Sequence, residues 1–492
     1  MALILLYILL LFGISRWSGR HATNETFYRG ERRSPWWLVA FGMVGASVSG
    51  VTFVSVPGMV LSSNMAYLQL CLGFILGYLV VAFVLLPVYY RLNLVSIYSY
   101  LDQRLGRCSY QTGAWFFLLS KMCGAALKFY VVCIILQRFV FQGLGVPFPL
   151  TVVGLVLLIW LYTRRGGIRT LVFTDTFQTL CMLTALILIL YKALTAMSMP
   201  LPDILESLMA DERSRVFVFD DWASPWNFWK QLLSGIFIVV VMTGLDQDMM
   251  QKNLTCKTLR DAQKDMCSYG VAFLPVNLLF LTLGLLLVQL FEQQGVALPA
   301  KADELLPMFV TQEGGELGNS CCLNLTLQNY PDSSPFGRGW GWVFPLGIMA
   351  ASFSSADSAL TSLTTSYCVD IRRRPHDERL RRNSHLCLCL LFVVAILLFD
   401  AINSKSLIDA IYTVVSYTYG PLLGLFAFGL FTKRQVRDRF VPYVCVAAPL
   451  LSYAIDLAST RLFSYHFGYE LLLLNGLLTI AGLACLMIKT SS

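Results

Sequence analysis

The stretch FPLGIMAASFSSADSALTSLTTSYCVDI, residues 344–371, is long enough to cross a membrane, yet its centre is rich in hydroxyl groups. At a rise of about 1.5 Å per residue, a helix of this length exceeds the roughly 30 Å hydrocarbon core of a bilayer. Helical spacing places its small and hydroxyl-bearing residues on one face: Ala351, Ser354, Ser355, Ser358, Thr361, Ser362 and Thr365. Asp357 lies beside that face.

A carboxylate inside a membrane costs about 2.5–3.5 kcal/mol on insertion scales, so it normally faces a cavity or a partner. Hydroxyl and carboxylate oxygens are hard ligands that suit a small, hard cation. The polar face of residues 344–371 therefore predicts the lining of an ion site. The competing interpretation is that small hydroxyl residues only allow close helix packing.

The composition indicates a membrane protein: 57% of the 492 residues are hydrophobic and 13% are charged, with a mean hydropathy of +0.65. The apolar runs predict an all-α polytopic fold with about thirteen transmembrane helices. These spans lie near residues 1–15, 36–62, 68–90, 111–141, 149–163, 170–195, 229–249, 266–291, 339–371, 386–402, 406–431, 440–457 and 469–488. No soluble domain is expected within residues 1–492, which are predicted to form a single transmembrane domain.

Basic residues indicate the orientation, because a cluster of Lys and Arg follows each odd-numbered span up to the eleventh. Such loops stay in the cytoplasm, which predicts a plasma (cell inner) membrane protein with its N-terminus outside and its C-terminus inside. The net charge of +8 is explained by these loops in contact with a lipid bilayer. Nucleic-acid binding would need a basic soluble domain, so no nucleic-acid partner is expected.

Two spans are predicted to be discontinuous helices. Residues 41–52 contain Gly42, Gly45, Gly50 and three hydroxyl side chains, and residues 243–252 combine a glycine with several polar residues. In transporters such breaks free backbone carbonyls at mid-membrane to bind ions and substrate. The two breaks occupy the same place in two five-helix units, 36–195 and 229–431, and an odd helix number inverts the second unit. The remaining helices, 1–15, 440–457 and 469–488, are peripheral.

Asp175 and Gln178 lie three residues apart, so a helix places both on one face near the cytoplasmic boundary. A functional interpretation is a polar site on this helix. The alternative is an interfacial acid that pairs with Arg169 or with another loop arginine.

Taken together, these motifs resemble the sodium/solute symporter family over roughly residues 20–440. The resemblance rests on GG-x5-TD-x-x-Q at residues 166–178, DQ-x-x-x-Q at 246–251, and the A-x-x-SS…D-I run at 351–371. A further match is Tyr-Gly-Pro at 419–421. The resemblance as a whole implies a five-plus-five inverted-repeat core like that of the leucine transporter, with alternating access.

The resemblance also implies a principal Na⁺ site, formed by the carbonyls of Gly45, Val48 and Ala351 and the hydroxyls of Ser354 and Ser355. Some family members bind a second Na⁺ at positions that match Asp175, Asp357 and Ser358. This chain departs from them because it has Asp at 357, where Ser or Thr is usual. A second cation or a proton is thus expected at that place.

The solute is harder to assign. Sugar carriers of the family have an acidic and an aromatic residue where this chain has Cys71 and Met242, which disfavours a sugar. The Ser-Val-Pro motif at 55–57 looks closer to the iodide, monocarboxylate and vitamin branch. The candidate substrate-binding residues are Ser47, Ser49, Thr52, Cys71, Lys121, Met242, Thr243 and Thr413.

Lys121 and Lys128 lie seven residues apart, two turns along the same face of one span. Lys121 is too deep to reach the interface easily, so its ammonium needs an anion. That anion is either an internal carboxylate, Asp175 or Asp248, or the substrate itself. We therefore expect a small anionic organic solute, with Lys121 as the candidate contact.

The leading hypothesis is a sodium-coupled symporter that imports this solute, with Na⁺ as coupling ion, no other cofactor and no enzymatic activity. A second hypothesis is a solute sensor that acts through a partner. A third is a membrane-embedded, metal-dependent enzyme in which Asp246 and Asp248 bind the metal; its weakness is that it would need a second acidic cluster.

Overall fold

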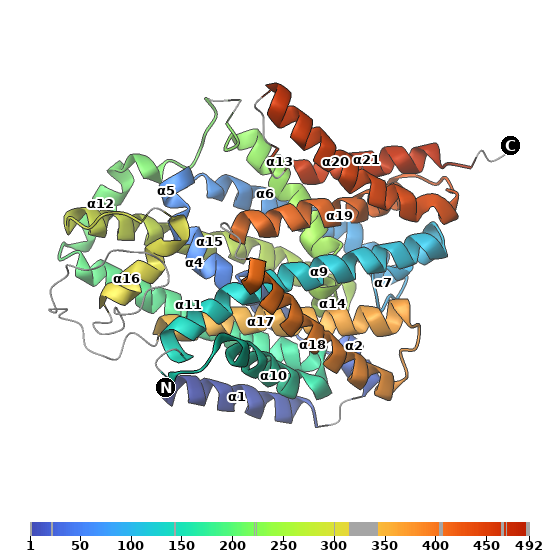
Figure 1. Ribbon diagram of the computed structural model, residues 1–492, viewed down its shortest axis with the longest axis horizontal. Helices are drawn as coiled ribbons and strands as arrows, with labels where there is room; N and C mark the ends of the chain where they lie inside the picture. The colour runs from blue at the N-terminus through green and yellow to red at the C-terminus, as the bar shows by residue number, and fades with distance from the viewer. Residues whose placement is uncertain are drawn as a thin grey trace.

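The computed structural model is almost entirely helical (Figure 1). It describes residues 2–20, 23–141, 144–220, 222, 224–299, 301–313, 343–402, 407–463, 467–468 and 470–488. Within these residues the only β-type pairing is two isolated bridges, Ser34 with Cys256 and Val436 with Met487. The helices are α1 (Ala2–Ser18), α2 (Asn24–Arg29), α3 (Trp36–Ser47), α4 (Gly50–Gly58), α5 (Val60–Ser63), α6 (Tyr67–Val80), α7 (Leu86–Arg91), α8 (Ser99–Arg104), α9 (Arg107–Leu136), α10 (Phe148–Gly166), α11 (Ile168–Ala196), α12 (Leu201–Ala210), α13 (Phe228–Val239), α14 (Gln247–Asn253), α15 (Leu259–Gln293), α16 (Leu305–Glu313), α17 (Val343–Ser366), α18 (Glu378–Ile402), α19 (Leu407–Phe431), α20 (Val441–Phe463) and α21 (Leu471–Cys485).

The polytopic all-α prediction is confirmed. In the described part of the chain, eight helices are long and apolar enough to cross a membrane, or ten when each of two bent pairs is taken as one span. Each predicted span overlaps a helix, and the shorter apolar helices α1 and α21 fall at the first and last of them. The count of thirteen membrane crossings stays a prediction.

Both predicted helix breaks are present. The axes of α3 and α4 differ by 63°, and the helix ending at Gly244 meets α14 at 71°. The side chain of Ser49 caps α4 by accepting from the amide of Thr52, and that of Asp246 caps α14 by accepting from the amide of Asp248. Capping satisfies amides that a helix start leaves unpaired, as burial away from water requires. The breaks open the two predicted repeats, which supports that division without testing it.

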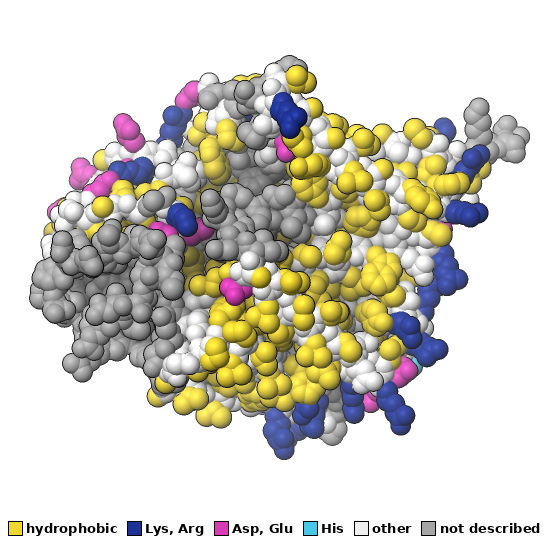
Figure 2. All heavy atoms as spheres, viewed as in Figure 1, with side chains coloured by type: hydrophobic (Ala, Val, Ile, Leu, Met, Phe, Trp, Pro, Cys, Tyr) yellow, Lys and Arg dark blue, Asp and Glu magenta, His cyan; other side chains and the backbone are white. Residues whose placement is uncertain are grey.

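The hydroxyl-rich stretch forms α17, which runs through the middle of the bundle beside α9 and α11 (Figure 1). In its most apolar 18-residue window 83% of the residues are buried, against 22% for the window in the span Asp438–Leu462. Protein therefore surrounds α17 on nearly all sides, and its hydroxyl groups face other helices. Figure 2 shows hydrophobic side chains over the middle of the visible face and Lys and Arg side chains gathered at its right-hand end.

Glycines allow two of these helices to cross closely. Gly73 of α6 and Gly235 of α13 lie backbone to backbone, since a Cβ on Gly235 would overlap the carbonyl oxygen of Leu70. Similarly, a Cβ on Gly73 would overlap the carbonyl of Leu232. Small residues at such crossings let membrane helices approach until their backbones touch.

We expect Gly235→Ala to lower the melting temperature of the purified protein, because the added methyl group forces α6 and α13 apart at a cost of about 1–3 kcal/mol. Gly154→Ala is the matched control, since a Cβ at Gly154 meets nothing within 4 Å. Equal melting temperatures for the two variants in detergent would contradict this close crossing.

Candidate functional site

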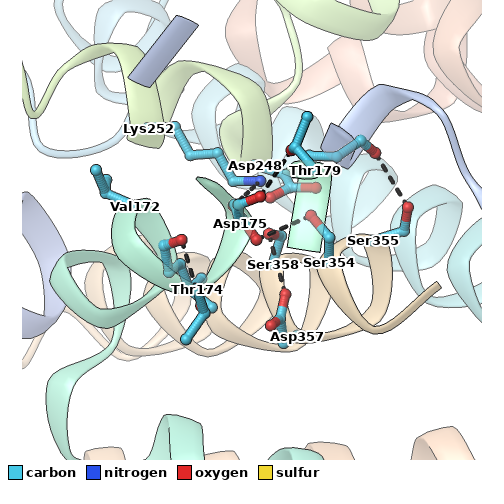
Figure 3. Close-up of polar contacts among 12 residues, drawn as sticks. Val172, Thr174, Asp175, Thr179, Asp248, Lys252, Ser354, Ser355, Asp357 and Ser358 are labelled. Atoms are coloured by element: carbon cyan, nitrogen blue, oxygen red, sulfur yellow. Dashed lines mark hydrogen bonds and ion pairs between the residues drawn. The ribbon is translucent and has the colours of Figure 1, made fainter. Parts of the chain in front are cut away.

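The site begins where α17 faces the break between α3 and α4. The hydroxyl of Ser355 donates to the carbonyl oxygen of Ala46 at 3.0 Å and to that of Ala351 at 3.3 Å. The hydroxyl of Ser354 donates instead to Oδ1 of Asp175 on α11, at 2.8 Å (Figure 3). Neighbouring residues of α17 therefore point in different directions, one toward the broken helix and one toward α11.

These contacts bring together part of the predicted Na⁺ site. Ser355 lies against the α3–α4 break, Ala351 accepts from Ser355 within α17, and Ser354 faces α11 instead. Val48 at the break is fully buried. Gly45 packs so closely on α11 that a Cβ there would overlap the hydroxyl of Thr179. The carbonyl that Ser355 contacts is that of Ala46, a residue which the sequence motifs do not single out. Hydroxyl and carbonyl oxygens of this kind suit Na⁺.

Asp175 has a different partner from the one expected. The ammonium of Lys252 lies 2.7 Å from Oδ2 of Asp175, and both side chains are almost fully buried. Arg169 is paired with Glu31 at 2.9 Å, so the predicted Asp175–Arg169 pair is wrong. Lys252 belongs to the basic cluster that follows the seventh predicted span, yet it is buried, because α14 follows a 71° bend and packs within the protein.

Asp357 and Ser358 lie on α17 beside this pair (Figure 3). Asp357 is fully buried; its Oδ2 accepts from the hydroxyl of Tyr162 at 2.6 Å and its Oδ1 from that of Ser358 at 3.3 Å. The three residues predicted for a second cation are thus brought together, with an ammonium group among them.

A cavity adjoins the break and holds most of the predicted substrate residues. Its lining includes Ser47, Ser49, Thr52, Lys121, Met242 and Thr243, and also Ser355. Cys71 is buried and is not part of this lining, so its role as a substrate contact stays a prediction. Its thiol is short, whereas the rings of Phe74 and Tyr78 on the same helix reach the cavity. The side chain of Thr413 lies outside the described residues.

Lys121 already has two carboxylate partners in the cavity wall. Its ammonium lies 3.1 Å from Oδ2 of Asp246 and 2.7 Å from Oδ2 of Asp248. Tyr419 donates to Oδ2 of Asp246 at 2.6 Å. Of the internal partners considered, Asp248 is confirmed and Asp175 is excluded by its pairing with Lys252.

Lys128, seven residues after Lys121, also lines the cavity. Within the described residues no carboxylate lies at ion-pair distance from its ammonium. The seven-residue spacing predicts that both lysines share a face, but it does not distinguish the paired lysine from the unpaired one. Two tyrosines complete the site: Tyr419 stands out in the sequence only as part of the Tyr-Gly-Pro match at 419–421, and Tyr162 is not singled out from the sequence.

Comparison with known proteins identifies the class to which this fold and site belong. The model of the sodium:solute symporter family matches residues 27–438, and the chain belongs to that family. The human sodium/iodide cotransporter is 24% identical over 445 residues, which span 87% of this chain and 64% of that protein. The sodium/sialic acid symporter SiaT of Proteus mirabilis is 22% identical over 446 residues, spanning 87% of this chain and 83% of that protein.

A solved structure, that of the substrate-bound outward-open state of a Na⁺-coupled sialic acid symporter with a novel Na⁺ site, has the same fold. Its TM-score is 0.79 at 18% sequence identity, with 98% of this chain and 96% of that chain covered. The fold expected from the motifs is thereby confirmed.

We expect Lys121→Met to destabilise the protein strongly, by about 3–5 kcal/mol, because it leaves Asp246 and Asp248 buried without a counter-charge. Lys128→Met removes a lysine from the same helix face but leaves no acid unpaired, so it should fold normally. Size-exclusion chromatography and melting temperature measure both variants. A well-folded Lys121→Met of wild-type stability would contradict the assigned ion pairs.

Proposed function

We propose that this protein is a sodium-coupled symporter that imports a small anionic organic solute by alternating access. The observation that carries the proposal is the position of Ser355, whose hydroxyl contacts the broken helix and also lines the cavity. One residue therefore belongs both to the oxygen cluster suited to Na⁺ and to the space suited to a solute. The proposal is also supported by membership of the family.

Coupling follows from this shared wall. Na⁺ bound between α17 and the α3–α4 break would hold the break in one arrangement, and Ser47, Ser49 and Thr52 at the break line the cavity. A ligand shifts a conformational equilibrium by its differential affinity for the two states, and the coupling between two ligands is reciprocal. One Na⁺ entering down 100 mV supplies about 2.3 kcal/mol, and a tenfold gradient adds roughly 1.4 kcal/mol.

The inference that the solute is an anion rests on Lys128. Asp246 and Asp248 are engaged by Lys121 and Tyr419, which leaves Lys128 as the charged cavity residue without a partner among the described residues. An ammonium group in a largely apolar wall favours a ligand that brings a negative charge. Lys121 then positions α14 through its ion pairs, and Lys128 meets the solute.

We further propose a location in the plasma membrane, with the N-terminus outside and the C-terminus in the cytoplasm. The support is the series of basic loops after odd-numbered spans and the gathering of Lys and Arg at one end of the visible face (Figure 2).

Transport is favoured over the metal-dependent enzyme by a specific contact. The two acids that a metal-dependent enzyme would use, Asp246 and Asp248, share the ammonium of Lys121. Searching the described residues gives no group of three or more His, Cys, Asp or Glu side chains that could hold a metal ion. Accumulation of solute in sealed vesicles distinguishes transport from sensing and from catalysis.

Ser354→Ala and Ser355→Ala are each expected to raise the Na⁺ concentration needed for stabilisation several-fold, because each removes a hydroxyl ligand. The control is Ser362→Ala: its hydroxyl donates to Ala359 within the same helix, away from the break. Melting curves of the purified proteins in Na⁺, K⁺ and choline measure the effect. An unchanged Na⁺ response in both site variants would exclude this site.

Lys128→Gln is expected to weaken binding of an anionic solute by about 10-fold or more, since a hydrogen bond to a charged group contributes about 1.5–3 kcal/mol. The probes are iodide, sialic acid and a short monocarboxylate, each tested by thermal shift in the presence of Na⁺. The Na⁺ response alone should be unchanged. Stabilisation of the wild type by cationic solutes only would contradict the anion assignment.

A further inference from the structure

Lys252 is the feature of the core that the proposed function does not use. Its side chain is 2% exposed, and its ammonium lies 2.7 Å from Oδ2 of Asp175. In the described part of the chain Asp175 is the one carboxylate within ion-pair distance of this ammonium. The residue belongs to α14, whereas Asp175 belongs to α11, so the ion pair joins two helices that are distant in sequence.

The oxygens that α11 and α17 present beside this ion pair resemble a cation site. Oδ1 of Asp175 accepts from Ser354, and Oδ1 of Asp357 accepts from Ser358. Figure 3 shows these side chains directed toward the same small region, with Lys252 entering from α14. Carboxylate and hydroxyl oxygens at this density are the ligands a small hard cation takes. Here a positive group of the protein itself already contacts Asp175.

The charge of Asp175 is already balanced within the protein. The ammonium of Lys252 lies 2.7 Å from Oδ2 of Asp175, and both side chains are almost fully buried. A Na⁺ bound to Asp175 in addition to this ammonium would add an uncompensated positive charge in the interior, and an uncompensated buried charge is costly.

We propose that the ammonium of Lys252 is a tethered cation that takes the place of a second Na⁺ at Asp175, so that this protein binds one Na⁺. The proposal rests on the proposed function, because it assumes the principal Na⁺ site at Ser354 and Ser355. An attached group competes at a high effective concentration, so dissolved Na⁺ displaces it poorly. Lys252 thereby sets the ion stoichiometry.

The test counts ²²Na⁺ ions bound per molecule of the purified full chain, with choline as the replacing cation and no solute present. The wild type should bind one Na⁺. Lys252→Met removes the charge and keeps the length, and it should bind two. Lys252→Arg is the matched control that keeps the charge, and it should bind one. If Lys252→Met does not fold, Lys252→Gln serves for the same test, because its neutral amide can still donate a hydrogen bond to Asp175.

A second readout is stability, because a bound ion stabilises the folded state in proportion to its occupancy. The melting temperature of Lys252→Met or Lys252→Gln should rise more steeply with Na⁺ than that of the wild type. Two Na⁺ in the wild type, or one in a folded Lys252→Met or Lys252→Gln, would overturn the proposal. Absence of Na⁺ binding to the wild type would instead contradict the proposed function.

Discussion

A group buried away from water must find its charge or hydrogen-bond partner within the protein, and this constraint organises the core around α14. This short helix carries Asp246 at its cap, Asp248 in its first turn and Lys252 in its last. The two acids contact Lys121 of α9, and Lys252 contacts Asp175 of α11. A helix of two turns is thus held by opposite charges on two long helices, and the 71° bend that precedes it is fixed by the same contacts.

Because α14 takes part in two charge clusters, it connects the region suited to ions with the region suited to the solute. Asp248 lines the cavity and pairs with Lys121, whereas Lys252 of the same helix pairs with Asp175. Any movement that separates α14 from α11 must break the Lys252–Asp175 pair inside the protein, at a cost that an incoming cation could offset. The proposed alternating access would therefore involve rearranging buried charges as well as sliding apolar helices.

Features set by local sequence were predictable, whereas those set by long-range packing were not. The spans follow from apolar length, and both helix breaks follow from glycines and polar residues at 41–52 and 243–252. Helical periodicity predicts that Ser354 and Ser355 lie on the polar face of their helix. Whether Lys252 points to water or to Asp175 depends on a bend between helices, which no local pattern encodes. For the same reason, the seven-residue spacing predicts that Lys121 and Lys128 share a helix face, but it does not predict which of them forms ion pairs. In the described residues Lys121 does so, with acids 125 or more residues away in the chain.

The bond from Ser354 to Asp175 shows how Lys252 and the expected Na⁺ influence each other without contact. A hydroxyl that donates its proton to a carboxylate keeps its lone pairs free, so Ser354 remains available as a cation ligand while bonded to Oδ1 of Asp175. The other oxygen, Oδ2, is neutralised by Lys252. Asp175 therefore orients the Ser354 hydroxyl, while Lys252 limits the negative charge that this carboxylate presents to the ion. In the proposed Na⁺ site the lysine would thus act through a single carboxylate, which ties the Na⁺ affinity proposed for Ser354 to a residue of another helix.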